Sequence, residues 1–144
     1  MLFKVKLNSA VLRKIFRHIK EPREQIGLLI GYLANDSLIV IDAACGEGAS
    51  NDSYTVFSPG ALAKVVDKII KGKIRGNIVG WYHSHVGRGV FMSDVDVQTQ
   101  LKLQQFSPYV IALVIDVVTG EFGIFSYDYR FGVVQFPEEQ IEIL

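Results

Sequence analysis

The sequence predicts an α/β (α+β) protein built on one mixed β-sheet flanked by helices. Apolar runs of strand length are interleaved with segments whose apolar residues recur at helical spacing, and short polar turns join some of the strands into hairpins. No repeat, low-complexity tract or Pro/Ser-rich linker divides the 144 residues. That length suffices for one compact core, so we expect a single domain over residues 1–144.

The chain begins with a short strand and a capped helix. Residues 3–7 alternate apolar and basic side chains, and Asn8 is a capping residue ahead of a helix over 10–18. An almost wholly apolar run at 26–33 is typical of a buried central strand. A polar turn then leads to an apolar run at 38–41, so we expect these two strands to form a hairpin.

The middle of the chain predicts a strand and a second helix. A polar, glycine-containing segment at 46–53 precedes the strand, which we expect at 54–57. Ser58 followed by Pro59 is a typical helix start, and Gly72 ends that helix. The next apolar strand carries two histidines.

The last third predicts one helix and three strands. Ser93 is a capping residue for a helix over 94–105. A long apolar strand follows at 109–118, and a Thr-Gly turn leads from it into a strand at 121–127. Residues 133–136 predict a final strand.

Composition narrows the functional classes. Hydrophobic residues make up 49% of the chain and charged residues 21%, as in globular proteins. The 15 basic and 15 acidic residues balance, so no basic excess indicates a nucleic-acid surface. No apolar run has the length of a membrane span or a signal peptide, and we expect a cytoplasmic protein without a membrane partner. The single cysteine, Cys45, excludes an intramolecular disulfide and a cysteine-based zinc site.

Two histidines at strand spacing indicate a metal site. His83 and His85 follow an apolar run, and side chains at i and i+2 of a strand share one face, so both imidazoles can reach one ion. Ser93 and Asp96 complete the pattern His-x-His-x7-Ser-x2-Asp. Two histidines and one carboxylate suit catalytic zinc, which takes three protein ligands and keeps a position for water. We therefore expect one Zn²⁺ per chain.

Some of these residues also have a purely structural interpretation. Ser93 by itself is a helix cap, and Asp96 by itself is a favourable acid in the first turn of that helix. A hydrolytic zinc site also needs a general base. On chemistry alone, the candidates for that base are Glu24, Glu47, Asp116 and Glu121.

A second motif precedes the central strand, where the chain reads Glu24-Gln25-Ile26-Gly27-Leu28-Leu29-Ile30-Gly31. Together with the His/Ser/Asp pattern, it resembles the JAMM (MPN+) metalloprotease family, and most closely its proteasome-lid deubiquitinase branch. The resemblance runs from about residue 3 to residue 129. It implies an MPN domain with a curved, cytidine-deaminase-like mixed sheet. It also implies a zinc-dependent isopeptidase or peptidase that cleaves after the C-terminus of ubiquitin or a ubiquitin-like protein.

The resemblance also assigns roles to individual residues. His83, His85 and Asp96 would bind zinc. Glu24 would be the general acid/base, and Ser93 would help to bind water or stabilise the oxyanion. Conjugates of ubiquitin or a ubiquitin-like protein are the expected partners, with the proteasome as a possible association. The chain ends at Leu144, without the long helical C-terminal region of the lid enzymes, so we expect a free-standing enzyme.

The chain departs from the eukaryotic pattern in the loop beside the metal. Val86 stands in place of a proline, and Arg88 in place of an aromatic residue. The segment 45–53 corresponds to a variable insertion that can act as a lid over the substrate tail, and its glycines suit that role. The residues that we expect to contact substrate are Glu47, Asp52, Val86, Arg88 and Met92.

Other functions remain as alternatives. Members of the wider MPN family that have lost the metal act as scaffolds, so a non-catalytic binding module for ubiquitin-like proteins is the second hypothesis. A zinc deaminase needs a Pro-Cys-x-x-Cys element, which a chain with one cysteine cannot supply. No His-Glu-x-x-His motif of the common metalloproteases is present either.

Overall fold

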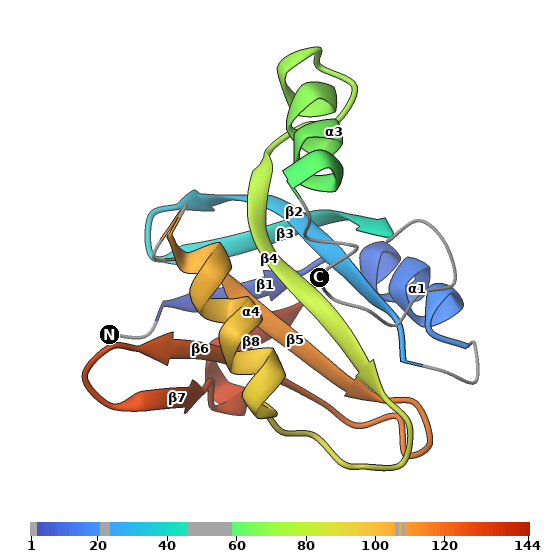
Figure 1. Cartoon of the computed structure of the whole chain (residues 1–144), viewed down its shortest axis with the longest axis vertical. Coiled ribbons are helices and arrows are strands. Elements are labelled where there is room, and N and C mark those ends of the chain that lie inside the picture. Colours follow the sequence, from blue (N-terminus) through green and yellow to red (C-terminus); the bar gives the residue numbers. More distant parts are fainter. Residues whose placement is uncertain (1–2, 21–23, 46–58, 106, 108) are drawn as a thin grey trace.

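A mixed eight-stranded β-sheet forms the centre of the molecule, with helices on both of its faces (Figure 1). The computed structural model describes residues 3–20, 24–45, 59–105, 107 and 109–144. Its strands are β1 (Lys4–Leu7), β2 (Ile26–Ala34), β3 (Ser37–Cys45), β4 (Asn77–His85), β5 (Ile111–Asp116), β6 (Phe122–Asp128), β7 (Gly132–Gln135) and β8 (Ile141–Ile143). Its helices are α1 (Ser9–His18), α3 (Pro59–Ile70), α4 (Asp94–Gln104) and the short 3-10 helix η1 (Glu138–Gln140).

The strands follow the order β7-β6-β5-β4-β2-β3-β1-β8. The β2–β3 hairpin is antiparallel, and β2 also pairs antiparallel with β4. The pair β4–β5 is parallel, as are the pairs that β1 makes with β3 and β8. The predicted mixed α/β architecture and the hairpin are therefore confirmed.

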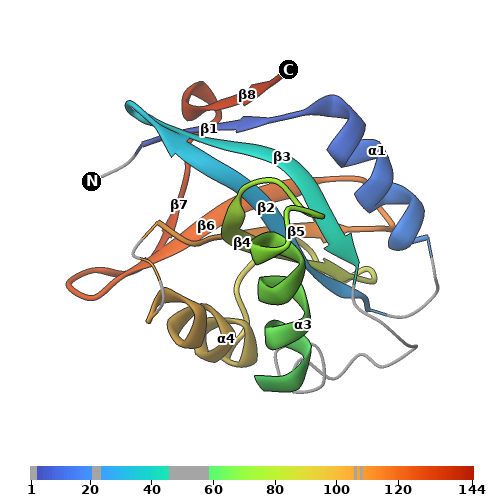
Figure 2. The same ribbon diagram turned by 90° about the horizontal axis from the view of Figure 1, so that it is seen from above.

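The two faces of the sheet carry separate apolar cores. On one face, α1 buries Val11 and Ile15 against the sheet, and Ile19 directly after the helix and the ring of Tyr82 belong to the same core. On the other face, α4 packs against Trp81 and its neighbours, and α3 lies on the same side of the sheet (Figure 2). Because side chains alternate along a strand, His83 and His85 share the α4 face with Trp81.

Strand β4 is held in close contact with both of its neighbours. A Cβ added at Gly80 would collide with the backbone carbonyl oxygen of Ile111 on β5. A Cβ added at Gly27 of β2 would collide with the buried ring of Tyr82. The absence of side chains at these two positions therefore lets the histidine-bearing strand pair closely with β2 and β5.

Several elements differ from the sequence-based expectations. The strand expected at 109–118 is shorter, because the residues after Asp116 form a turn in which the Asp116 side chain accepts a hydrogen bond from Val118 N. The helix η1 and strand β8 were not expected. The strand expected at 54–57 lies outside the described residues. Among the described helices, none combines the length and apolar character that a membrane crossing requires.

Candidate metal centre

Three side chains converge where β4 ends and α4 begins. His83 Nδ1 lies 2.8 Å from Asp96 Oδ1, and His85 Nε2 lies 3.3 Å from Asp96 Oδ2. One ligand atom from each residue lies within 4.8 Å of the others. Two imidazoles and one carboxylate match the donor preference of a catalytic zinc ion, so the residues present fit such an ion. The three residues with the predicted spacing thus form one group that could hold a metal.

Strand β4 presents the two histidines on the α4 side. The indole of Trp81 stacks on the His83 ring with 5.9 Å between the ring centroids. The two imidazoles meet edge to face with 5.1 Å between their centroids. His85 is fully buried, and the His83 side chain is 12% exposed. One imidazole is therefore enclosed by protein, while the other is partly exposed to solvent.

A capping box places Asp96. The Ser93 hydroxyl oxygen accepts a hydrogen bond from Asp96 N at 3.1 Å, and Asp96 Oδ2 accepts one from Ser93 N at 3.1 Å. This arrangement fixes the first turn of α4. The cap that a structural interpretation predicts is present, and it points the Asp96 carboxylate at both histidines.

Buried glutamines hold α4 against the sheet. Gln100 Oε1 accepts a hydrogen bond from Trp81 Nε1 at 2.8 Å, and Gln100 Nε2 donates to the Val110 carbonyl at 2.7 Å. Gln104 Nε2 donates to the Tyr127 carbonyl at 3.0 Å. Sequence reasoning missed both residues, although two amides four positions apart on a helix that is packed on a sheet were an available signal.

Burial and hydrogen bonding compete at the centre of the group. Burial works to raise the pKa of the Asp96 carboxyl, but the hydrogen bonds from His83 and His85 outweigh it and hold the pKa below its ordinary value. Burial works to lower the pKa of His85, but its hydrogen bonds to Asp96 and to the Gly89 carbonyl raise it above its ordinary value. Asp96 therefore remains an ionised carboxylate, as a metal ligand must be.

Glu24 lies beside His83, the more exposed of the two histidines. Its Oε1 is 3.3 Å from His83 Nε2, and its Oε2 accepts hydrogen bonds from Arg88 Nε at 2.9 Å and Nη2 at 2.7 Å. Ser84, the residue between the two histidines, fixes the neighbouring backbone, because its Oγ accepts a hydrogen bond from Gln25 N at 2.7 Å. The structure therefore brings Glu24 to the group, as a base would require.

The other carboxylates that chemistry alone allowed as bases are placed differently. Asp116 is 1% exposed, and hydrogen bonds from Val118 N, Gly87 N and Gly89 N lower the pKa of its carboxyl. The Glu121 side chain is exposed beyond the end of β5. Glu47 lies outside the described residues. Asp116 lies beside His85 in the β4–β5 register, but backbone N–H groups engage its carboxylate, and Glu121 is exposed, so the structure favours Glu24.

The residues predicted to contact substrate have mixed surroundings. Val86 is exposed in the loop after β4, and Arg88 both contacts Glu24 and lies over the Phe91 ring at 5.6 Å. Met92 packs against the core on the α4 face, so its side chain has a structural role there. Glu47 and Asp52 lie outside the described residues.

Ser93→Ala would separate the helix cap seen in the structure from the oxyanion role that the family resemblance implies for this hydroxyl. In the cap the oxygen accepts, which leaves the hydroxyl hydrogen available to donate. Loss of a cap costs roughly 1 kcal/mol of stability. Loss of an oxyanion donor lowers turnover by about 10²–10³-fold with little change in melting temperature. We expect both losses, measured by thermal unfolding and peptide-bond cleavage, and recovery in Ser93→Thr. A lower melting temperature with normal turnover would leave only the cap.

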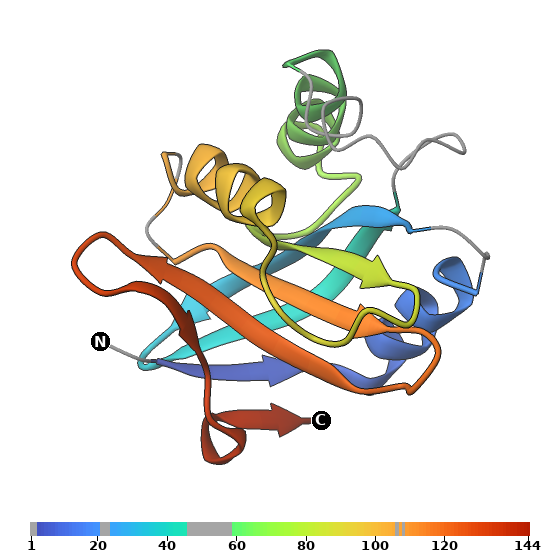
Figure 3. The same cartoon turned by 60° about the horizontal axis from the view of Figure 1, so that its bottom comes forward.

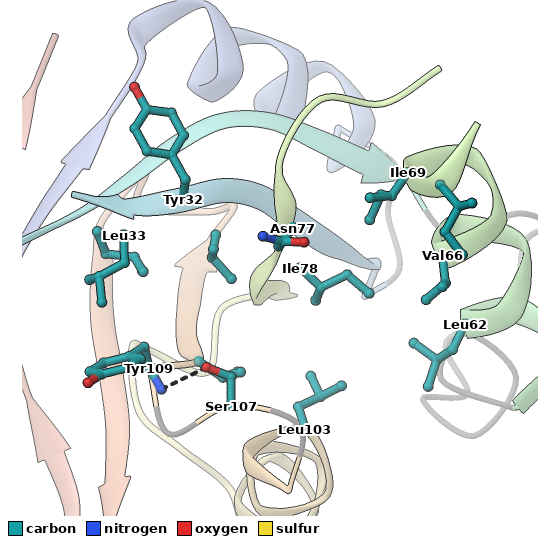
Figure 4. Close-up of a pocket in the computed structure, with 14 residues that line it drawn as sticks. Tyr32, Leu33, Leu62, Val66, Ile69, Asn77, Ile78, Leu103, Ser107 and Tyr109 are labelled. Carbon is teal, nitrogen blue, oxygen red and sulfur yellow. Dashed lines mark hydrogen bonds between the residues drawn. The ribbon is translucent and has the colours of Figure 1, made fainter. Parts of the chain in front are cut away.

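A separate apolar pocket of about 490 Å³ lies between α3, α4 and one end of β2 and β4 (Figure 4). Figure 4 shows Leu62, Val66 and Ile69 of α3 on one side and Leu103 of α4 below. No residue of the metal group lines this pocket, so it is distinct from the candidate metal centre.

Comparison with known sequences shows which protein family this chain resembles. A family model described as JAB1/Mov34/MPN/PAD-1 ubiquitin protease matches residues 2–109. The 26S proteasome regulatory subunit rpn11 of Schizosaccharomyces pombe is 31% identical over 83% of this chain and 40% of its own length. The COP9 signalosome complex subunit 5 of Gibberella zeae is 31% identical over 88% of this chain and 41% of its own length. The chain thus spans about two fifths of these relatives.

Comparison with solved structures supports the fold. The solution structure of protein DSY2949 from Desulfitobacterium hafniense superposes with a TM-score of 0.74 at 19% identity. The match covers 97% of this chain and 92% of the other. The overall arrangement of sheet and helices is therefore shared with a protein of similar length.

Proposed function

This chain belongs to the JAB1/Mov34/MPN/PAD-1 family, and from that membership we propose that it is a zinc-dependent isopeptidase or peptidase. Its substrate would be the bond that follows the C-terminus of ubiquitin or a ubiquitin-like protein. The observation that carries the proposal is the convergence of His83, His85 and Asp96 on one point, with Glu24 beside His83.

In this proposal each residue has a distinct task. His83, His85 and Asp96 would hold a zinc ion, which would make water nucleophilic near neutral pH and polarise a carbonyl. A water oxygen bonds to the carbonyl carbon of the scissile bond, and Glu24 accepts the proton that this water loses. Glu24 returns the proton to the leaving amine nitrogen as the C–N bond breaks. The Ser93 hydroxyl donates a hydrogen bond to the carbonyl oxygen as it gains negative charge.

The alternative is a non-catalytic scaffold that binds ubiquitin-like proteins. The complete metal group and the adjacent Glu24 favour catalysis, because a binding module needs neither. The relatives from proteasome and COP9 signalosome complexes support a role in a ubiquitin pathway, either within a complex or as a free-standing cytoplasmic enzyme.

Cleavage of ubiquitin-like fusions tests this proposal. The protein is incubated with ubiquitin and ubiquitin-like proteins fused through their C-termini to a reporter. We expect release of the reporter, its loss on addition of a chelator, and its recovery when zinc is restored. Binding of the fusion without cleavage under all zinc conditions would instead establish the scaffold function.

A further inference from the structure

The loop that follows His85 is wrapped around a buried carboxylate. Asp116, at the end of β5, accepts hydrogen bonds from Gly87 N at 3.0 Å and from Gly89 N at 2.7 Å. Both glycines have positive φ angles, 77° and 92°, a backbone conformation that L residues rarely adopt. The loop after β4 and the turn after β5 lie side by side at one end of the sheet (Figure 3). The Asp116 carboxylate therefore fixes the backbone of this loop at Gly87 and Gly89.

The same loop contacts the metal group through a backbone carbonyl. The Gly89 carbonyl oxygen lies 2.9 Å from His85 Nδ1. A carbonyl can only accept, so the imidazole hydrogen that meets the Gly89 oxygen sits on Nδ1, which leaves Nε2 as the nitrogen that would bind a metal ion. Hydrogen bonds of this type to the second nitrogen of a histidine ligand set its tautomer and ring orientation.

We propose that Asp116 is a positioning residue for the metal ligand His85, acting through Gly87, Gly89 and the Gly89 carbonyl. Asp116 lies beside His85 in the β4–β5 register, and its carboxylate accepts hydrogen bonds from backbone N–H groups rather than from the imidazole. The same two backbone contacts hold the loop from which Arg88 reaches Glu24. The inference rests on the proposed metal-binding role of the site and not on the identity of the substrate.

Asp128 is a matched control for the possibility that Asp116 only stabilises a turn. Asp128 accepts hydrogen bonds from Arg130 N at 2.7 Å and Phe131 N at 3.0 Å, in the turn between β6 and β7. It performs the same kind of turn stabilisation away from the metal group. Asp128→Asn should therefore reproduce a loss of turn stability without any change at His85.

The decisive measurement is zinc affinity, obtained by competition with a chromogenic chelator. We expect Asp116→Asn to bind zinc about 10–100-fold more weakly than the parent, the usual effect of removing an outer-shell partner. Asp128→Asn should bind zinc as the parent does. Equal zinc affinity in the parent and Asp116→Asn would overturn the inference, whereas a parent that binds no zinc would overturn the proposed function instead.

Two further measurements keep the test decisive. Gly87→Ala strains the loop at φ 77° without removing a buried carboxylate, and Gly132→Ala imposes similar strain at φ 84° in the β6–β7 turn. Only Gly87→Ala should weaken zinc binding. In the zinc-loaded protein, NMR of the His85 imidazole should show a slowly exchanging Nδ1–H in the parent and a faster one in Asp116→Asn, because the loop that carries the Gly89 carbonyl is then held less firmly. An unchanged exchange rate in that variant would also overturn the inference.

Discussion

Glu24→Gln is expected to keep its zinc and to lose about 10²–10⁴-fold in turnover of a ubiquitin-like fusion, the range typical of a positioned acid/base group. The amide has the size of the carboxylate but cannot take a proton from water and return it to an amine. Because Glu24 lies 3.3 Å from His83 and is not one of the three grouped ligands, the metal should remain bound. Elemental analysis and initial rates measured on the same preparation check both expectations.

Two variants identify the cause of such a loss. Glu121→Gln removes an exposed carboxylate that chemistry alone also allows as a base, and it should cleave at the parental rate. Arg88→Ala removes the ion pair with Glu24 but leaves the carboxylate, so it should not reproduce the full loss. The pair is partly exposed and contributes at most about 1 kcal/mol, so neither change should unfold the protein. Parental activity in Glu24→Gln would require a different base.

The metal group was predictable because its geometry is largely local. The face shared by His83 and His85 follows from the two-residue period of a strand, and the position of Asp96 follows from the helix start at Ser93. Glu24 needed the family resemblance. It approaches the site only because β2 and β4 pair antiparallel with Ile26 beside His83, a contact between segments far apart in the sequence.

The partners of the supporting residues also lie far away in the sequence. The four-residue spacing of Gln100 and Gln104 could mark them as a pair, but no periodicity encodes their bonds to Val110 and Tyr127, or those of Asp116 to the loop after β4. The strand β8 has three residues, and only its parallel pairing with β1 makes it a strand. The apolar residues after Asp116 satisfy a strand pattern, yet the hydrogen bonds of the Asp116 side chain turn the chain there.

Asp96→Asn is expected to abolish zinc retention and reduce cleavage to background. The amide removes the negative charge that the two imidazoles face and offers one acceptor oxygen instead of two. Asp94→Asn is the matched control, because Asp94 lies in the same first turn of α4 but is exposed and outside the group. It removes a similar charge from the helix N-terminus and should keep both zinc and activity.

A second variant excludes misfolding as the explanation. Asp96 also closes the capping box, so its replacement costs roughly 1 kcal/mol of stability apart from any metal effect. His83→Ala leaves the cap intact and should lose zinc equally. A ligand that binds only the folded state raises stability by about 2.7 kcal/mol at one hundred times its Kd, so added zinc should raise the melting temperature of the parent and of Asp94→Asn alone. Full zinc retention in both Asp96→Asn and His83→Ala would move the metal site elsewhere in the chain.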